Sequence, residues 1–525
     1  MIRLRQIKIN IDDYSENSLK EIIAYKLKID KNKIISYKIN KKSIDARKKP
    51  IIYFIFEVDV NLKEEKEILN KVGSNDIFYL ENENYIFPFK NNKKYNNRPV
   101  IIGSGPAGLF CAYFLSEAGF NPLIIERGEP VDDRVKTVEK FFESGKLNKN
   151  SNVQFGEGGA GTFSDGKLNT LIKDPLFRKK KVLEIFVECG ANSEILYENK
   201  PHIGTDVLIN VVRNMRNKII SMGGEFLYNT TLTNINIESS KVVSIEVNNN
   251  KIIPVDVLVL AIGHSARDTF EMLYNNNLNM ESKPFAVGLR VEHPQNLINK
   301  SQYGENYYKL PNASYKLTYK SKSGRGVYSF CMCPGGYVVN ASSEDRMLCV
   351  NGMSYSNRAS HNSNSAIIVT VTKKDFGENP LDGIKYQRDL EKKAYEIGNG
   401  MIPVQLFNDF MDNKLTKKIE ENYPLTKGKH CFADLNKIFP NYINEALKEA
   451  IVYFDRQIKG FSSSNPILSG VESRTSSPIK ILRDENFESN ILGIYPCGEG
   501  AGYAGGITSS AIDGIKVAEA VLKKV

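Results

Sequence analysis

The stretch that decides the fold, residues 99–128, reads PVIIGSGPAGLFCAYFLSEAGFNPLIIERG. A short apolar run over 100–102 is followed by a glycine-rich turn, a helical pattern and a second apolar run over 123–125. This succession predicts a buried strand, a tight turn, a helix and a second strand parallel to the first. We therefore expect an α/β protein built on a Rossmann-like unit.

The turn itself predicts what this unit binds. Gly103, Gly105 and Gly108 fit the spacing G-x-G-x-x-G, in which the glycines permit the turn, the approach of a pyrophosphate and close helix packing. Pro106 suits the first turn of a helix, whose free N–H groups attract phosphate. Glu126 ends the second strand, where its carboxylate can accept hydrogen bonds from both ribose hydroxyls of an adenosine. We predict a dinucleotide site; the alternative is a glycine turn in an ordinary α/β unit.

Composition sets the class of protein. The chain has 525 residues, of which 41% are apolar and 25% charged, as in soluble globular proteins with two to four domains. It contains no run of about 18 apolar residues and no signal-peptide core, so we expect no membrane span and a cytoplasmic location. Its seven cysteines lack paired C-x-x-C spacing, which indicates reduced thiols and no metal site.

The N-terminal part has its own pattern. Residues 1–90 alternate strand-like and helical segments in the order β-α-β-β-α, which predicts a small α+β domain of ferredoxin-like type, followed by a polar linker over 91–97. In residues 1–100, basic side chains outnumber acidic ones 21 to 14. A basic surface can suit nucleic acid, but the charges are interspersed, so we expect an ordinary solvated surface and consider nucleic-acid binding unlikely.

Three further segments belong with the glycine turn. They are a glycine-rich loop over 156–167, an apolar strand ending in Ala-Ile-Gly over 257–263, and the stretch 493–508, which reads GIYPCGEGAGYAGGIT. Together with the turn, they resemble the FAD-binding proteins of the glutathione reductase-like superfamily. In that superfamily threonine stands at the position of Ile262 and aspartate often stands at that of Glu499.

The resemblance implies a domain plan and a cofactor. FAD would bind a discontinuous domain made of residues 98–280 and 465–525, with an α+β substrate domain inserted over 281–464. The glycine-rich loop would lie against the flavin ring, the last helix would point its N-terminus at flavin N1 and O2, and Leu232 would offer its backbone to adenine. The residues implied to contact FAD are Gly103, Gly105, Pro106, Ala107, Gly108, Glu126, Arg127, Gly158, Gly159, Gly161, Thr162, Leu232, Ala261, Gly263, Gly498, Glu499, Gly505, Gly506 and Ile507.

A closer resemblance covers residues 98–525. The strings over 152–170, 260–268 and 496–509 are similar to those of a poorly characterised bacterial family of FAD-dependent dehydrogenases or oxidoreductases. The segment 326–341 is distantly similar to a substrate-domain motif of geranylgeranyl reductases, which puts this strand at the substrate cavity.

Candidates for substrate chemistry carry weaker signals. Arg474 precedes the last cofactor segment and can bind an anion or pin a loop by an ion pair. His293 and Arg290 share one strand-like segment, and either side chain can serve as a general acid or have a structural role. Cys333 follows Cys331 by two residues, so a regular strand would place both thiols on one face. They are either small buried residues or, less expectedly, a redox or metal pair.

The expected function is that of an FAD-dependent oxidoreductase, a dehydrogenase or reductase that passes hydride or electrons between flavin and an unsaturated small-molecule substrate. A second G-x-G-x-x-G following a strand is absent, so NAD(P)H would dock transiently if it is the donor; a protein or quinone donor is the alternative. The competing interpretations are a flavin monooxygenase and an FAD-containing protein that binds nucleic acid or a partner through its basic N-terminal domain. The sequence predicts no oligomeric state.

Overall fold

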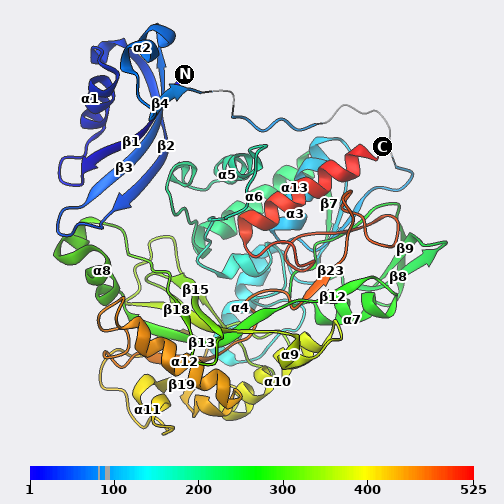
Figure 1. Cartoon of the computed structure of the whole chain (residues 1–525). Helices are drawn as coiled ribbons and strands as arrows, with labels where there is room; N and C mark the ends of the chain where they lie inside the picture. Colours follow the sequence, from blue (N-terminus) through cyan, green and yellow to red (C-terminus); the bar gives the residue numbers. More distant parts are fainter. Residues whose placement is uncertain (81–82, 89–94, 525) are drawn as a thin grey trace.

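The computed structural model describes residues 1–80, 83–88 and 95–524, so residues 91–94 of the predicted linker lie outside the described residues. Figure 1 shows three parts: an N-terminal α+β unit, a central region in which helices cover a parallel sheet, and a large antiparallel sheet with its own helices. Within the described ranges, no helix has both the length and the apolar character needed to cross a bilayer.

The central sheet is parallel and has the strand order β24-β11-β5-β6-β7. Alternate side chains point to opposite faces of a strand, and here both faces are apolar. Ile101, Ile124 and Val259 pack with the helices, whereas Val100 and Leu258 pack toward a three-stranded antiparallel sheet. The strands of the parallel sheet are β5 (Val100–Ile102), β6 (Leu123–Ile125), β7 (Glu225–Leu227), β11 (Leu258–Leu260) and β24 (Ile494–Pro496).

Covering elements complete this layered arrangement. The helices are α3 (Pro106–Glu117), α4 (Val131–Ser144), α5 (Arg178–Glu188), α6 (Thr205–Ser221), α7 (Arg267–Asn275) and α13 (Ile507–Lys523). The opposite layer holds β8 (Leu232–Glu238), β9 (Lys241–Val247) and β10 (Lys251–Pro254), and a small pair of strands, β12 (Met280–Ser282) and β23 (Ile479–Ile481), lies near it.

Helices α3 and α13 lie side by side and begin at the same edge of the parallel sheet (Figure 1). Glycine makes this close approach possible. A Cβ on Gly514 would lie 2.2 Å from the carbonyl oxygen of Ala107, and one on Gly108 would lie 1.9 Å from that of Gly103. Both contacts are with backbone, so any side chain would force the helices away from the strand and from each other.

The second large sheet has seven strands in the order β14-β15-β18-β13-β22-β19-β21. Strand β22 pairs with β13 and β19, although it follows the predicted domain boundary at residues 464–465, so this sheet extends past that boundary to Glu472. The strands are β13 (Phe285–Pro294), β14 (Thr318–Lys320), β15 (Gly326–Cys333), β18 (Asn362–Val371), β19 (Ile402–Leu406), β21 (His430–Phe432) and β22 (Ile467–Glu472).

Helices and a smaller sheet surround these strands. Residues 381–460 contain helices together with three short strands: β19 is buried, whereas β20 (Thr426–Lys427) and β21 are partly exposed. The helices are α8 (Gln295–Tyr303), α9 (Lys373–Phe376), α10 (Asp382–Ile397), α11 (Phe407–Met411) and α12 (Asn441–Phe454), and the smaller sheet holds β16 (Tyr337–Asn340), β17 (Val350–Met353) and β20 (Thr426–Lys427).

The N-terminal unit has the strand order β2-β3-β1-β4, which is that of a ferredoxin-like arrangement. Its arginines pair with acidic side chains: Arg3 contacts Asp59 at 2.6 Å, Arg5 contacts Glu57 at 3.0 Å, and Arg47 contacts Asp45 at 2.8 Å. The backbone of Lys42 bonds to residues 197 and 199 of the central region. The elements are β1 (Ile2–Asn10), α1 (Glu16–Leu27), β2 (Ile34–Asp45), β3 (Tyr53–Leu62), α2 (Glu65–Val72) and β4 (Ile77–Tyr79).

Candidate functional site

A cavity of about 370 Å³ lies at the carboxyl ends of the parallel strands. One wall comes from the loops that follow β5, β6, β11 and β24, and the opposite wall comes from the seven-stranded sheet and the smaller sheet beside it, through Phe330, Cys331, Asn351 and Glu472. Ligands of open α/β sheets bind at this end of the strands. The cavity therefore joins the predicted cofactor region to the predicted substrate region.

Two long helices begin at this cavity without a side-chain cap. The N-caps of α3 and α13 are Gly105 and Gly506, and neither supplies a side-chain acceptor to the free N–H groups. A Cβ on Gly105 would meet only the Cα of Gly159, at 3.8 Å, and one on Gly505 would meet nothing within 4 Å. Free N–H groups and positive dipole ends beside open space fit an anionic dinucleotide.

Glu126 lies at the end of β6 and is 5% exposed. One carboxylate oxygen accepts hydrogen bonds from the backbone N–H of Ser104 at 2.9 Å and from its hydroxyl at 2.8 Å. The other accepts from the N–H groups of Gly128 and Gly156, both at 3.0 Å. Glu126 thus ties the glycine turn to the glycine-rich loop, and a ribose hydroxyl would have to replace the Ser104 hydroxyl as donor.

The glycine-rich loop is held by Arg134 of α4, a residue that the sequence did not single out. Its guanidinium is buried and donates to the carbonyl groups of Asn152, Val153, Gly156, Glu157 and Gly159. Burial lowers the pKa of Arg134 to about 10, so the side chain stays charged at neutral pH. A Cβ on Gly156 would lie 2.4 Å from its Cδ, which explains a glycine there.

All but four of the predicted cofactor residues line the cavity. Gly108 packs on the strand, as described above. Gly158 and Thr162 face each other, since a Cβ on Gly158 would lie 2.2 Å from the Thr162 hydroxyl. The N–H of Gly498 donates to Asp513 of α13 at 2.7 Å. These four residues shape the cavity from behind its surface.

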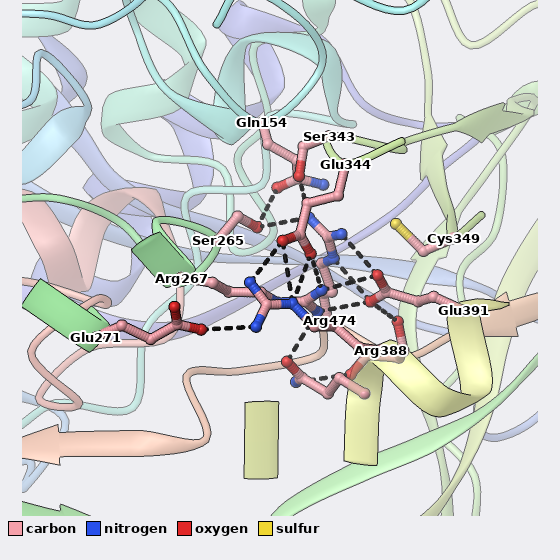
Figure 2. Close-up of polar contacts among 12 residues, drawn as sticks. Gln154, Ser265, Arg267, Glu271, Ser343, Glu344, Cys349, Arg388, Glu391 and Arg474 are labelled. Atoms are coloured by element: carbon pink, nitrogen blue, oxygen red, sulfur yellow. Dashed lines mark hydrogen bonds and ion pairs between the residues drawn. The ribbon is translucent and has the colours of Figure 1, made fainter. Parts of the chain in front are cut away.

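Arg474 also lines the cavity, and its guanidinium is fully engaged (Figure 2). It contacts Glu391 of α10 at 2.9 and 2.7 Å and donates to the hydroxyls of Ser265 and Ser343 at 3.2 and 2.5 Å. Glu391 is completely buried and accepts from Arg267 as well, at 2.7 and 2.9 Å. Of the two roles considered for Arg474, the geometry matches an ion pair that fixes a loop.

The ion pairs around Glu391 form a larger cluster (Figure 2). Arg267 contacts Glu344 at 2.5 Å, and Arg388 contacts Glu344 at 2.7 Å and Glu271 at 2.6 Å. Three arginines thus face three glutamates. Burial alone would raise the pKa of Glu391, but the guanidiniums of Arg267 and Arg474 outweigh it and hold this pKa far below its usual range.

The remaining catalytic candidates lie outside the cavity lining. His293 is buried, contacts the carbonyl oxygen of Phe461 at 2.7 Å, and has its pKa lowered to about 4 by burial. Arg290 is buried and paired with Glu472, which does line the cavity, at 2.8 Å. Both residues therefore support the wall rather than face a ligand.

The expectation that Cys331 and Cys333 share one face is wrong. The register with β18 shifts between Phe330 and Cys333, and Cys331 has a φ of 47°, so the strand bulges at this point. Cys331 is exposed and lines the cavity, whereas Cys333 is buried, and burial raises the pKa of its thiol to about 11. A bulge leaves no signal in residue spacing alone.

Sequence reasoning also missed Asn351, Glu472, Gln154 and Thr230, which line the cavity. Gln154 lies within the string over 152–170 but was assigned no role there, and the other three lie outside the quoted motifs. Thr230 lies two residues before the predicted adenine-side residue Leu232, and extending that segment would have found it. Asn351 and Glu472 come from strands whose place in the fold the sequence did not predict.

Comparisons with known protein families agree with this geometry. Residues 101–133 match the family described as an NAD(P)-binding Rossmann-like domain, and residues 284–475 match the family described as an FAD-dependent protein, C-terminal domain-like. Residues 1–61 match a domain of unknown function. The fold and the cavity thus define a dinucleotide-binding protein of Rossmann-like type.

A protein of Clostridium beijerinckii, described as an uncharacterized protein, is 49% identical over 530 residues, covering 100% of this chain and 99% of that one. The chain therefore belongs to the same family as this protein, and it carries the matches to an FAD-dependent C-terminal domain and to an NAD(P)-binding Rossmann-like domain.

Solved structures show more distant similarity. Glycine oxidase from Bacillus cereus is 11% identical, with a TM-score of 0.37 over 82% of this chain and 96% of that one. A geranylgeranyl bacteriochlorophyll reductase-like protein from Thermoplasma acidophilum is 11% identical, with a TM-score of 0.33 over 81% of this chain and 78% of that one. The family assignment rests on the family matches and the C. beijerinckii relative.

Replacing Arg134 with methionine tests the role of the buried guanidinium. Its loss removes a donor from five carbonyl groups, and those of Asn152 and Val153 then have no other donor among the described residues, at about 1–3 kcal/mol for each one that stays buried and unpaired, so the loop loosens. We expect FAD to bind at least about tenfold more weakly, a loss of roughly 1.4 kcal/mol, measured by quenching of FAD fluorescence. Lys136→Met, on the exposed side of the same helix, is the control. Equal FAD affinity in Arg134→Met and the control would contradict this role.

Replacing Glu391 with glutamine tests the ion-pair cluster. Two arginines then lose their shared carboxylate, and we expect a loss of about 3–5 kcal/mol in the free energy of unfolding, measured in urea at neutral pH. Glu396→Gln, at an exposed position of α10, should change it by less than about 0.5 kcal/mol.

The stability difference between the native protein and Glu391→Gln should depend on pH. The pKa of Glu391 is lowered in the folded state, so its contribution is complete above its unfolded pKa, about 4.3, and is lost as the pH falls toward the folded pKa. The stability difference between the native protein and Glu391→Gln should be constant near neutral pH and should narrow below about pH 4.3. A difference that is equally large at all pH values would show that it does not come from this carboxylate.

Proposed function

We propose that the protein is an FAD-dependent oxidoreductase that passes hydride or electrons between flavin and an unsaturated small-molecule substrate. The observation that carries the proposal is a cavity with two chemically different walls. One wall has the features of a dinucleotide site, and the other comes from two further sheets that present Phe330, Asn351 and Glu472. A cofactor and a substrate can meet in such a cavity without leaving it.

The residues of the first wall fit FAD. In the proposed complex, the N-termini of α3 and α13 bind the pyrophosphate and the flavin end of the cofactor, and Glu126 and Leu232 lie at its adenosine end. The glycine-rich loop, held by Arg134, offers backbone rather than side chains to a flat ring. FAD supplies the redox chemistry when bound, and the protein supplies orientation and fixed charge.

The second wall gives the substrate a rigid environment. Arg474 and Glu472 both line the cavity, and each is held by a buried partner of opposite charge, at 2.7 Å for Arg474 and 2.8 Å for Glu472. Side chains fixed in this way keep their positions as charge develops at a reacting centre. We further propose NAD(P)H as a transiently docked electron donor.

Anaerobic stopped-flow mixing of the purified protein with NADH or NADPH tests the proposal. We expect the flavin absorbance band to bleach with at least one of the two nucleotides, and the colour to return when an unsaturated acceptor is added without oxygen. A band that returns only with oxygen would favour a monooxygenase. Failure of both nucleotides and of dithionite to bleach the protein would contradict an oxidoreductase role.

A further inference from the structure

One cation in the cavity wall has no counterion of its own. Lys167, the last residue of the glycine-rich loop, lines the cavity, and its Nζ atom is buried without a hydrogen-bond partner among the described residues. Its ion-pair partner is Asp165, whose Oδ2 lies 3.4 Å from Nζ. A buried ammonium group with three unused donors is costly unless a ligand supplies an acceptor.

The Asp165 carboxylate is already neutralised by another cation. Asp165 is 2% exposed, and its two oxygens accept from Nε and a terminal nitrogen of Arg358 at 3.0 and 2.5 Å. Because one carboxylate faces two cations, the group made of Lys167, Asp165 and Arg358 carries one surplus positive charge. His202 beside it adds none, since burial lowers its pKa to about 4.

The arginines of the cavity wall are paired with carboxylates. Arg127 pairs with Asp268 at 2.9 Å, and Arg474 belongs to the cluster of three arginines and three glutamates. The wall also holds the carboxylates of Glu126, which is bonded to backbone N–H groups, and Glu499, which lies 3.5 Å from His264. Among the lysine and arginine side chains of the described lining, Lys167 is therefore the one whose carboxylate partner is already bonded to another cation.

The position of Lys167 separates it from the phosphate end of the cavity. Phosphates fit beside Gly105 and Gly159, at the start of α3, whereas Lys167 pairs with Asp165, which is bonded to Arg358 from the region that forms the opposite wall. Lys167 thus lies where the substrate would be held. An ammonium group is a compact charge that suits a carboxylate.

We propose that Lys167 is the anchor for a carboxylate group of the substrate, so that the protein acts on a small organic acid. This inference rests on the proposed function, because only that function makes the bound acid a substrate. The substrate carboxylate would neutralise the surplus charge and accept hydrogen bonds from Nζ, and Arg358 would keep Asp165 from taking that role. Within the cavity, the anchor would fix one end of the acid against the second wall.

Calorimetric titration of the FAD-loaded protein tests the anchor. The probes are acetate, propionate and benzoate, each paired with its neutral amide. We expect at least one acid to bind about tenfold more tightly than its amide, and Lys167→Met to lose that preference, about 1.4 kcal/mol. Lys167→Arg should keep it, and Lys173→Met, an exposed lysine of the same loop, should behave like the native protein.

Three results would overturn the proposal. The first is that no acid binds more tightly than its amide. The second is that Lys167→Met keeps the preference for the acid while thermal unfolding shows that this variant is folded. The third is that Lys167→Met lowers the flavin midpoint potential and leaves acid binding unchanged, because the charge then serves the reduced cofactor. Protein without flavin would contradict the proposed function instead, and the same titration would still test the anion site.

Discussion

The carboxylate of Glu391, shared by Arg267 and Arg474, is the constraint on which the relative placement of the two walls depends. Arg267 begins the helix that follows a parallel strand, Glu391 lies on α10 of the antiparallel region, and Arg474 follows β22. One buried group therefore connects three segments that are far apart in the chain. Removing one member of such a set leaves an uncompensated buried charge, which is why the arrangement is held tightly once it has formed.

A second set of contacts fixes the wall that holds the glycine-rich loop. Arg134 and Glu126 do not bond to each other, but they act on the same loop. The guanidinium donates to three carbonyl groups of the loop and to two just before it, and the carboxylate accepts one N–H group of the loop. The loop is thus fixed from both sides before any ligand binds. Together with the uncapped N-termini of α3 and α13, it forms a site whose free backbone N–H groups lie at the cavity. The protein bears the cost of ordering this site when it folds.

The sequence predicted the elements that depend on local pattern. Residues 99–128 indicated the strand, turn and helix, because glycine spacing and apolar runs act over a few residues, and most of the predicted cofactor residues line one cavity. Local sequence pattern could not predict the contacts between segments that are distant in the chain. Arg134 lies on an amphipathic helix and resembles a surface residue, and Glu391 bonds to partners 83 and 124 positions away. A bulge at Cys331 separates its side chain from that of Cys333, although the spacing predicted that both lie on one face.

The central claim is that this cavity holds FAD as a resident cofactor. The most direct measurement is mass spectrometry of the small molecules released when the purified protein is denatured, with the amount compared with the amount of chain. The account predicts about one FAD per chain, with the cofactor recovered intact. Protein that releases no flavin, and takes up none when FAD is supplied during refolding, would contradict it.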